Sequence, residues 1–154
     1  MEKKIEWEEY LAEDQPFPLP TDADVAALER YLGRVLPDDY KDVLKAHQGQ
    51  TPEPGGIPIG KGGSVFGCLF HAFLSGSDMS YSVAANTKRM EKWGFKNYVA
   101  FTDDTGNSHF CFDYNASPTN PPIVFIDGDF EVTDPRSIIP IANSFTELLN
   151  MLEE

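Results

Sequence analysis

The sequence is poor in cysteine, in basic residues and in long apolar runs, and each shortage excludes a class of protein. Its 154 residues include two cysteines, too few for a disulfide framework or a four-cysteine zinc site. No apolar run approaches the roughly 20 residues that a helix needs to cross a bilayer. The charged first nine residues lack the apolar core of a signal peptide. We therefore expect a cytoplasmic protein that has no membrane partner.

The charge of the chain is strongly one-sided. Lysine and arginine number 12 against 25 aspartates and glutamates, which gives a net charge of −13. A charge of this sign repels phosphate backbones, so a basic protein is expected as the partner and nucleic acid is not. Residues 103–154 alone hold ten acidic residues and one base, Arg136. This excess serves either solubility or the recognition of a cationic partner.

The order of the expected elements predicts an α+β fold in a single domain that spans residues 1–154. Eleven Phe, six Tyr and two Trp supply material for its core. Apolar spacing and boundary residues predict helices over residues 5–12, 21–33, 36–49, 77–93 and 144–152. They predict strands over residues 57–59, 65–74, 98–102, 108–114, 123–127 and 130–132. We expect a largely antiparallel central sheet with the helices packed on one side.

Several boundaries follow from single residues. Thr21 and Ser144 each stand three positions before an acidic residue, which is the pattern of a capping box and predicts the start of a helix. Gly33 is expected to end the first long helix. Residues 106–107 (Gly-Asn) and 127–128 (Asp-Gly) predict tight turns between strands.

Two pairs of potential zinc ligands lie close together in the sequence, and they are Cys68 with His71 and His109 with Cys111. On a strand, residues two apart share a face, as His109 and Cys111 do. Residues three apart face opposite ways, as Cys68 and His71 do. Because a tetrahedral site needs all four ligands to converge, thiols that pack as small apolar groups are the alternative. The sequence carries no signature of a cysteine hydrolase, and we expect no catalytic residue, no metal and no cofactor.

Acidic residues gather in the expected turns of the C-terminal half. They are Asp103, Asp104, Asp113, Asp127, Asp129, Glu131 and Asp134. A pair of them could serve glycoside hydrolysis. Residues 127–131 are similar to the start of a calcium loop, but the loop's sixth-position glycine is missing and Ile138 stands where its twelfth-position glutamate belongs. The alternative is that these residues only form turns, which Asp and Gly favour.

Two further patterns suggest binding. Residues 60–64 are rich in glycine but match neither the Walker nor the Rossmann spacing, so a hairpin or loop is expected. Lys88, Lys92 and Lys96 lie four apart with Arg89 beside them, and on a helix they would line one face. That face is either solvated or a contact for an acidic ligand.

Three stretches of the chain together resemble one protein family. Residues 26–33 (AALERYLG) run into residues 36–44 (LPDDYKDVL). Residues 101–113 read FTDDTGNSHFCFD, and residues 124–127 (VFID) precede residues 142–149 (ANSFTELL). In this order they resemble the helical opening, the central hairpin, and the closing strand and helix of the SUKH superfamily. That group includes fungal cell-wall glucan-synthesis regulators and bacterial immunity proteins of polymorphic toxin systems.

The resemblance implies a SUKH-like α+β domain that binds protein and does not catalyse a reaction. Bacterial members typically bind and neutralise a cognate toxin, often a nuclease. An acidic surface suits such a partner, because carboxylates can lie where phosphates would. We interpret Asp103, Asp104, Asp127 and Asp129 as the candidate contacts. The alternative functions are a regulatory scaffold in cell-wall or glucan-synthesis signalling and a small carboxylate- or metal-dependent hydrolase.

Overall fold

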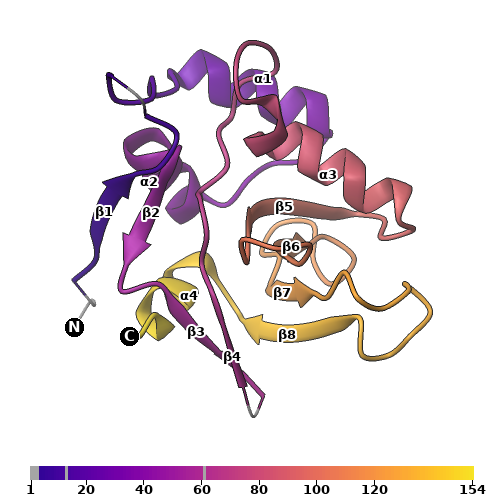
Figure 1. Ribbon diagram of the computed structural model, residues 1–154. Coiled ribbons are helices and arrows are strands. Elements are labelled where there is room, and N and C mark those ends of the chain that lie inside the picture. The colour runs from indigo at the N-terminus through magenta and orange to yellow at the C-terminus, as the bar shows by residue number, and fades with distance from the viewer. Residues whose placement is uncertain (1–3, 13, 61) are drawn as a thin grey trace.

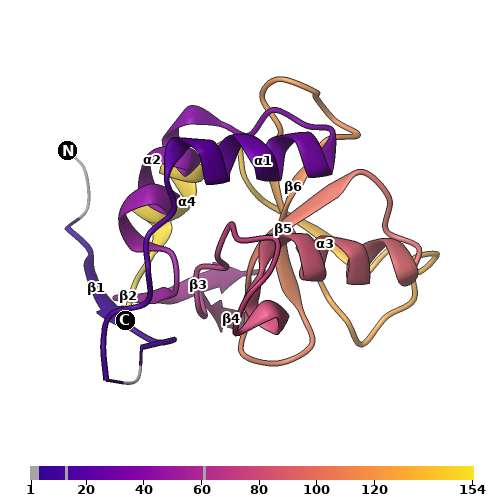
Figure 2. The same cartoon turned by 90° about the horizontal axis from the view of Figure 1, so that it is seen from above.

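The computed structural model describes residues 4–12, 14–60 and 62–154, which form four helices, a short 3₁₀ turn and three antiparallel sheets (Figures 1 and 2). The helices are α1 (Asp22–Leu32), α2 (Asp38–His47), α3 (Val83–Lys92) and α4 (Phe145–Met151), and the 3₁₀ turn is η1 (Met79–Tyr81). The strands are β1 (Glu6–Glu9), β2 (Gln50–Glu53), β3 (Gly56–Ile59), β4 (Gly62–Val65), β5 (Tyr98–Asp103), β6 (His109–Asp113), β7 (Ile123–Ile126) and β8 (Ile138–Ala142). The predicted α+β class is confirmed. No helix among the described residues combines the length and the apolar character needed to span a membrane.

The central sheet has four strands in the order β5-β6-β7-β8, and each is antiparallel to the next. Its pairs include Asp103 with His109 and Ile126 with Ile138. Because neighbouring strands run in opposite directions, the turn from β5 to β6 and the loop from β7 to β8 lie at the same end of the sheet. The two smaller sheets are the hairpin β3-β4 and the pair β1-β2.

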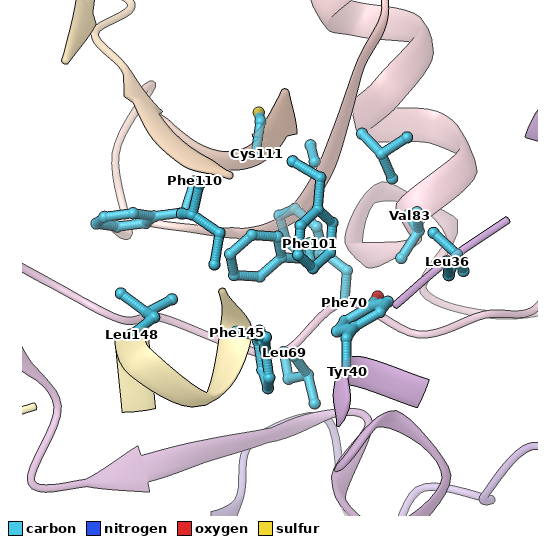
Figure 3. Close-up of a cluster of buried hydrophobic side chains, with 14 of the residues drawn as sticks. Leu36, Tyr40, Leu69, Phe70, Val83, Phe101, Phe110, Cys111, Phe145 and Leu148 are labelled. Carbon is cyan, nitrogen blue, oxygen red and sulfur yellow. The ribbon is translucent and has the colours of Figure 1, made fainter. Parts of the chain in front are cut away.

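An aromatic cluster joins the central sheet to α2 and α4 (Figure 3). The ring centroid of Tyr40 in α2 lies 5.0 Å from that of Phe112 and 5.9 Å from that of Phe101. Phe145 of α4 lies 5.2 Å from Tyr40, and Cys111 points away from the cluster. All these rings are buried, and each buried side chain of this size contributes about 1.5–3 kcal/mol through the hydrophobic effect.

Helix α3 lies along β5, the edge strand of the central sheet (Figure 1). Ser82 caps its start, with Oγ accepting a hydrogen bond from Ala85 N at 3.0 Å. Thr87 Oγ1 accepts from Ala100 N at 3.1 Å, so the helix satisfies a backbone group of the edge strand. Gly94 follows the helix with a φ of 96°, a conformation that favours glycine.

Most of the local predictions are confirmed. Thr21 Oγ1 accepts from Asp24 N at 3.1 Å, and Asp24 Oδ2 accepts from Thr21 N at 2.8 Å, so the capping box is present. Gly33 ends α1 in the left-handed conformation, with a φ of 67°. Strands β5, β6 and β7 match the predicted spans to within one residue at each end. A strand at residues 57–59 is confirmed as β3, whereas Lys61 of the glycine-rich stretch lies outside the described residues.

The helix predicted over residues 5–12 is wrong, because this segment forms β1 and pairs with β2. Its exposure alternates: Trp7 is half-buried and its neighbours Glu6 and Glu8 are exposed. The Trp7 ring stacks on His47 with centroids 4.8 Å apart. The alternation of exposed and half-buried residues, together with pairing to the distant strand β2, overrides the weak helical spacing of the apolar residues.

The strand predicted over residues 130–132 is also wrong, and the fourth strand of the sheet is β8. Residues 127–137 form successive turns instead, with Phe130 N donating to Asp127 O and Ser137 N to Asp134 O. Strand β8 could not be predicted from the sequence, because Pro140 interrupts its apolar run. Proline is tolerated there because β8 is an edge strand.

Two other predicted elements are shorter than expected. The strand predicted over residues 65–74 reduces to the end of β4, because the buried segment that follows bonds to several elements in turn. Gly67 N donates to Asp103 O and Leu69 N to Gln50 O. The helix predicted over residues 77–93 begins only at Val83, after η1.

Two buried tyrosines give a paired test of this core. Tyr40 is fully buried, and its hydroxyl has no hydrogen-bond partner among the described residues, whereas the Tyr114 hydroxyl donates to Val35 O at 2.7 Å. We predict that Tyr40→Phe leaves the free energy of unfolding unchanged or raises it by up to about 1 kcal/mol, and that Tyr114→Phe lowers it by about 1 kcal/mol. Urea unfolding of both variants measures the difference. Equal losses would contradict the assignment of an unsatisfied hydroxyl at Tyr40.

Candidate functional site

Two loops meet at one end of the central sheet, where the β5–β6 turn contacts the loop from β7 to β8. Gly128 N donates to Ser108 Oγ at 3.1 Å. A side chain at residue 128 would overlap the backbone oxygen of Asn107, so only glycine allows this approach. The two loops form one surface, which we call the acidic edge and define as residues 103–108 and 127–137.

The acidic edge concentrates negative charge. It carries six carboxylates and one guanidinium, that of Arg136. The carboxylates belong to Asp103, Asp104, Asp127, Asp129, Glu131 and Asp134. Arg136 donates to both carboxylate oxygens of Asp134, at 3.1 and 2.8 Å, and these bonds lower the pKa of the Asp134 carboxyl. The other five carboxylates form no ion pair within 4 Å among the described residues.

The structure brings together the four aspartates predicted as contacts, and in each of them Oδ1 accepts a hydrogen bond from within the acidic edge. Asp104 Oδ1 accepts from two backbone N–H groups of its own turn, at 2.9 and 3.2 Å. Asp127 Oδ1 accepts from Asp129 N at 2.9 Å, and Asp129 Oδ1 accepts from Asn107 Nδ2 at 3.3 Å. In the part of the chain that the structure describes, no donor bonds to Oδ2 of these three residues. Each therefore keeps one carboxylate oxygen available, while the other is bonded within its own turn or, at Asp129, to the opposite loop.

Asp103 is set apart by the segment that packs against it. Burial raises the pKa of its carboxyl. Its Oδ1 accepts from Thr105 N at 3.1 Å, and its backbone oxygen accepts from Gly67 N at 2.8 Å. A Cβ on Gly67 would lie only 2.5 Å from Asp103 Oδ1. Asp103 therefore holds the turn and is the least available of the four to a partner.

An apolar groove of about 410 Å³ adjoins the acidic edge. Its lining residues are Trp93, Phe95, Gly128, Phe130, Glu131, Val132 and Thr133. They come from the end of α3 and from the β7–β8 loop, which lie side by side in Figures 1 and 2. This groove could not be predicted from the sequence, because no spacing rule connects segments so far apart in the chain and the pattern around Phe130 and Val132 predicts a strand.

His109 is buried between β6 and α3, next to the acidic edge. Its Nε2 lies 3.1 Å from Asn86 Oδ1. Asn86 uses its amide N–H groups for the backbone oxygens of Ser80 and Ser82, so its Oδ1 accepts and His109 Nε2 carries the proton. Nδ1 is buried without a partner among the described residues. Burial, aided by the nearby Arg89, lowers the pKa of His109 to about 4, so the ring is neutral at pH 7.

The cysteines and the candidate metal ligands do not form a reactive group. Cys68 and Cys111 are buried free thiols, and burial raises the pKa of each. Reactive or metal-binding cysteines are instead thiolates. Among the described residues, no three His, Cys, Asp or Glu side chains form a group that could hold a metal ion. The structure therefore assembles neither the zinc set considered from the sequence, which also included His71 and His109, nor calcium ligands at residues 127–131.

The predicted basic face around α3 is only partly formed. The helix ends at Lys92, so Lys96 lies in the connector to β5. Arg89 is half-buried, and its guanidinium donates to Asn86 Oδ1 at 3.0 Å. Lys88 instead lines a hollow of about 310 Å³ between α1 and α3, together with Arg34.

The contact at Gly128 can be tested by adding one methyl group. We predict that Gly128→Ala lowers the free energy of unfolding by about 1–3 kcal/mol, because the new Cβ overlaps the Asn107 backbone and forces the loops apart. Urea unfolding measures the loss, and hydrogen exchange should show faster exchange at the Gly128 amide. Gly62→Ala is the matched control, because the nearest atom to its Cβ would be Ile59 O at 4.0 Å. A loss no larger than that of the control would contradict the close contact.

Burial of His109 predicts a dependence of stability on pH. The pKa of His109 is about 4 in the folded chain and about 6.5 in the unfolded chain, so the unfolded state binds the proton more readily. This contribution to the free energy of unfolding is fully present above pH 6.5 and is lost as the pH falls toward 4. At pH 5 the loss amounts to about 2 kcal/mol. Unfolding of the wild type and of His109→Gln at pH 7 and pH 5 measures it. The wild type should lose more stability than the variant between these values, and equal losses would show that His109 titrates normally.

A comparison with protein-family models identifies the family of this chain. The model of the SMI1 / KNR4 family (SUKH-1) matches residues 19–151. The matched region runs from just before α1 to the end of α4 and includes the whole acidic edge, whereas β1 lies outside it. No individually curated protein matches the chain. Since the match covers most of its length, and the SUKH resemblance of the sequence is thereby confirmed, the chain belongs to the SMI1 / KNR4 family (SUKH-1).

Proposed function

We propose that the chain is a bacterial immunity protein, which acts in the cytoplasm and neutralises a cognate polymorphic toxin by covering it with the acidic edge. Membership of the SMI1 / KNR4 family supports a role in binding or regulation. The net charge of −13 favours a basic partner. A nuclease fits this description, because a surface that binds nucleic acid is basic.

The observation that carries the proposal is the arrangement of carboxylates on the acidic edge. Asp104, Asp127 and Asp129 each use one oxygen for a hydrogen bond within the acidic edge and keep the other available. On a nuclease, these oxygens would take the positions of phosphate oxygens and pair with the same lysines and arginines. Asp103 completes the set and adds negative charge close to the surface. The mechanism is occlusion: the toxin's basic surface is covered, so its substrate cannot bind.

The charge also serves the speed of capture. An immunity protein has to bind its toxin before the toxin acts, so the rate of association matters as much as the affinity. Opposite charges on two partners raise this rate above that of a neutral encounter, and salt reduces the gain. Six carboxylates against one guanidinium on two adjacent loops provide such a field.

The side chains that resemble catalytic groups are better explained as structural. His109 is neutral and buried with its proton on Nε2, and both thiols are buried. The carboxyl of Asp103 has a raised pKa, as a general acid would, but it packs against Gly67 and holds the turn at Thr105. These placements support a non-catalytic protein over a hydrolase.

A regulatory scaffold in cell-wall or glucan-synthesis signalling is the second candidate. The family match is compatible with it, and so is an acidic surface that binds a basic partner. The two candidates differ in the partner and in the consequence of binding. Only an immunity protein should protect a cell from a toxin.

Neutralising the acidic edge tests the proposal. The triple variant Asp104→Asn, Asp127→Asn and Asp129→Asn removes three charges and keeps an amide oxygen for each hydrogen bond of the turns. The wild-type chain should restore the growth of cells that express the toxin encoded beside it. The triple variant should lose this protection, and its association with the toxin domain should slow by about tenfold at low salt and less at high salt.

The matched control removes three charges elsewhere. Glu6, Glu8 and Asp42 are exposed and lie outside the acidic edge, so Glu6→Gln, Glu8→Gln and Asp42→Asn should leave association and protection close to those of the wild type. If both triple variants protect equally well, the acidic edge is not the interface. If the wild-type chain gives no protection and does not bind the toxin domain, the immunity proposal fails and the scaffold is favoured.

A further inference from the structure

The apolar groove beside the acidic edge exposes large hydrophobic side chains to solvent. Trp93 is 42% exposed and Val132 is 39% exposed. Phe130 also lines the groove and is half-buried. Exposed apolar side chains that gather around one hollow commonly mark a binding surface, whereas single ones do not. The groove therefore has the character of a contact site and not only of a packing defect.

The groove is held in shape by contacts on each wall. Gly94 packs so closely on the β7–β8 loop that a Cβ there would lie 2.9 Å from Val132 Cγ1. The Trp93 ring meets His109 edge to face, with centroids 6.1 Å apart. The guanidinium of Arg136 lies 4.3 Å above the Phe130 ring. A groove that is already formed loses little conformational freedom when a partner binds.

The charges around the groove indicate the kind of partner. Glu131 lines it, and Asp127 and Asp129 stand on the same loop. Three cations lie nearby: Arg136, which is already bonded to both oxygens of Asp134, and Lys92 and Lys96, which adjoin Trp93 and Phe95 in the chain. The groove is thus an apolar hollow bordered by unpaired carboxylates, and its complement is an apolar side chain bordered by basic ones.

We infer that this groove receives one apolar side chain, aliphatic or aromatic, that projects from the basic surface of the toxin between lysines or arginines. The apolar side chain packs between Trp93 and Val132, and the flanking cations reach the carboxylates of Asp127 and Asp129. This inference rests on the proposed function and specifies how the partner is held.

The two parts of the surface have separable kinetic effects. Charges at the rim of an interface act mainly on the rate of association. Buried apolar anchors act mainly on the rate of dissociation, because their contacts form only in the docked complex. Neutralising the carboxylates should therefore slow binding, and removing the apolar wall should speed release.

Substitutions at Val132 test the inference. Val132→Asn and the nearly isosteric Val132→Thr make the wall polar without changing the charge. The partner in the measurement is the toxin domain encoded beside the chain, made catalytically inactive, and binding is followed by surface plasmon resonance. We expect Val132→Asn to raise the dissociation rate at least tenfold and Val132→Thr to raise it severalfold, with association rates within about twofold of wild type.

The matched control is Val65→Asn, at a valine of similar exposure (43%) on the β3-β4 hairpin. It should dissociate like the wild type, and thermal unfolding should show all three variants folded. If the Val132 variants dissociate like the wild type while the aspartate triple variant associates slowly, the groove is not an anchor, although the acidic edge remains the interface. If the wild-type chain does not bind the toxin domain at all, the proposed function itself is overturned, and the inference with it.

Discussion

The close approach of Gly128 to the Asn107–Ser108 backbone fixes the positions of the carboxylates on the acidic edge. Two loops that together carry six carboxylates repel each other, and the contact has to hold them against that repulsion. It does so with a backbone N–H on Ser108 Oγ and with the Asn107 amide on Asp129. Because no side chain separates the two backbones, the carboxylates of both loops belong to one surface.

The strands behind this surface are supported from two directions. On one side, the rings of Phe101 and Phe112 pack with Tyr40 and with α4. On the other, His109 meets Asn86 and α3 adds a hydrogen bond to the edge of β5. The turn from β5 to β6 therefore extends from two strands that are held in place by packing on both sides. Loops on such a support can differ in sequence without disturbing the fold.

Local chemistry was predictable from the sequence, and long-range pairing was not. The cap at Thr21, the end of α1 at Gly33 and the acidic turns all depend on a few adjacent residues, so their patterns identified them. Strand β1 forms only because β2 pairs with it, and Pro140 masks β8. The four aspartates could be named as candidate contacts because they lie in or next to predicted turns, and their role stays a prediction. The groove was missed because Trp93 and Val132 meet only in the folded chain.

The position of Asp127 and Asp129 beside the groove, and not in its lining, has an energetic reason. Removing a carboxylate from water costs more than a single ion pair returns unless its other bonds are satisfied. At Asp127 and Asp129 one oxygen is already bonded within the acidic edge, and Asp127 is half-buried while Asp129 is exposed, so pairing with a cation needs little further loss of hydration. The adjacent groove can then bury apolar area at no such cost. On a surface divided in this way, the charges raise the rate of association and the apolar contact lowers the rate of dissociation.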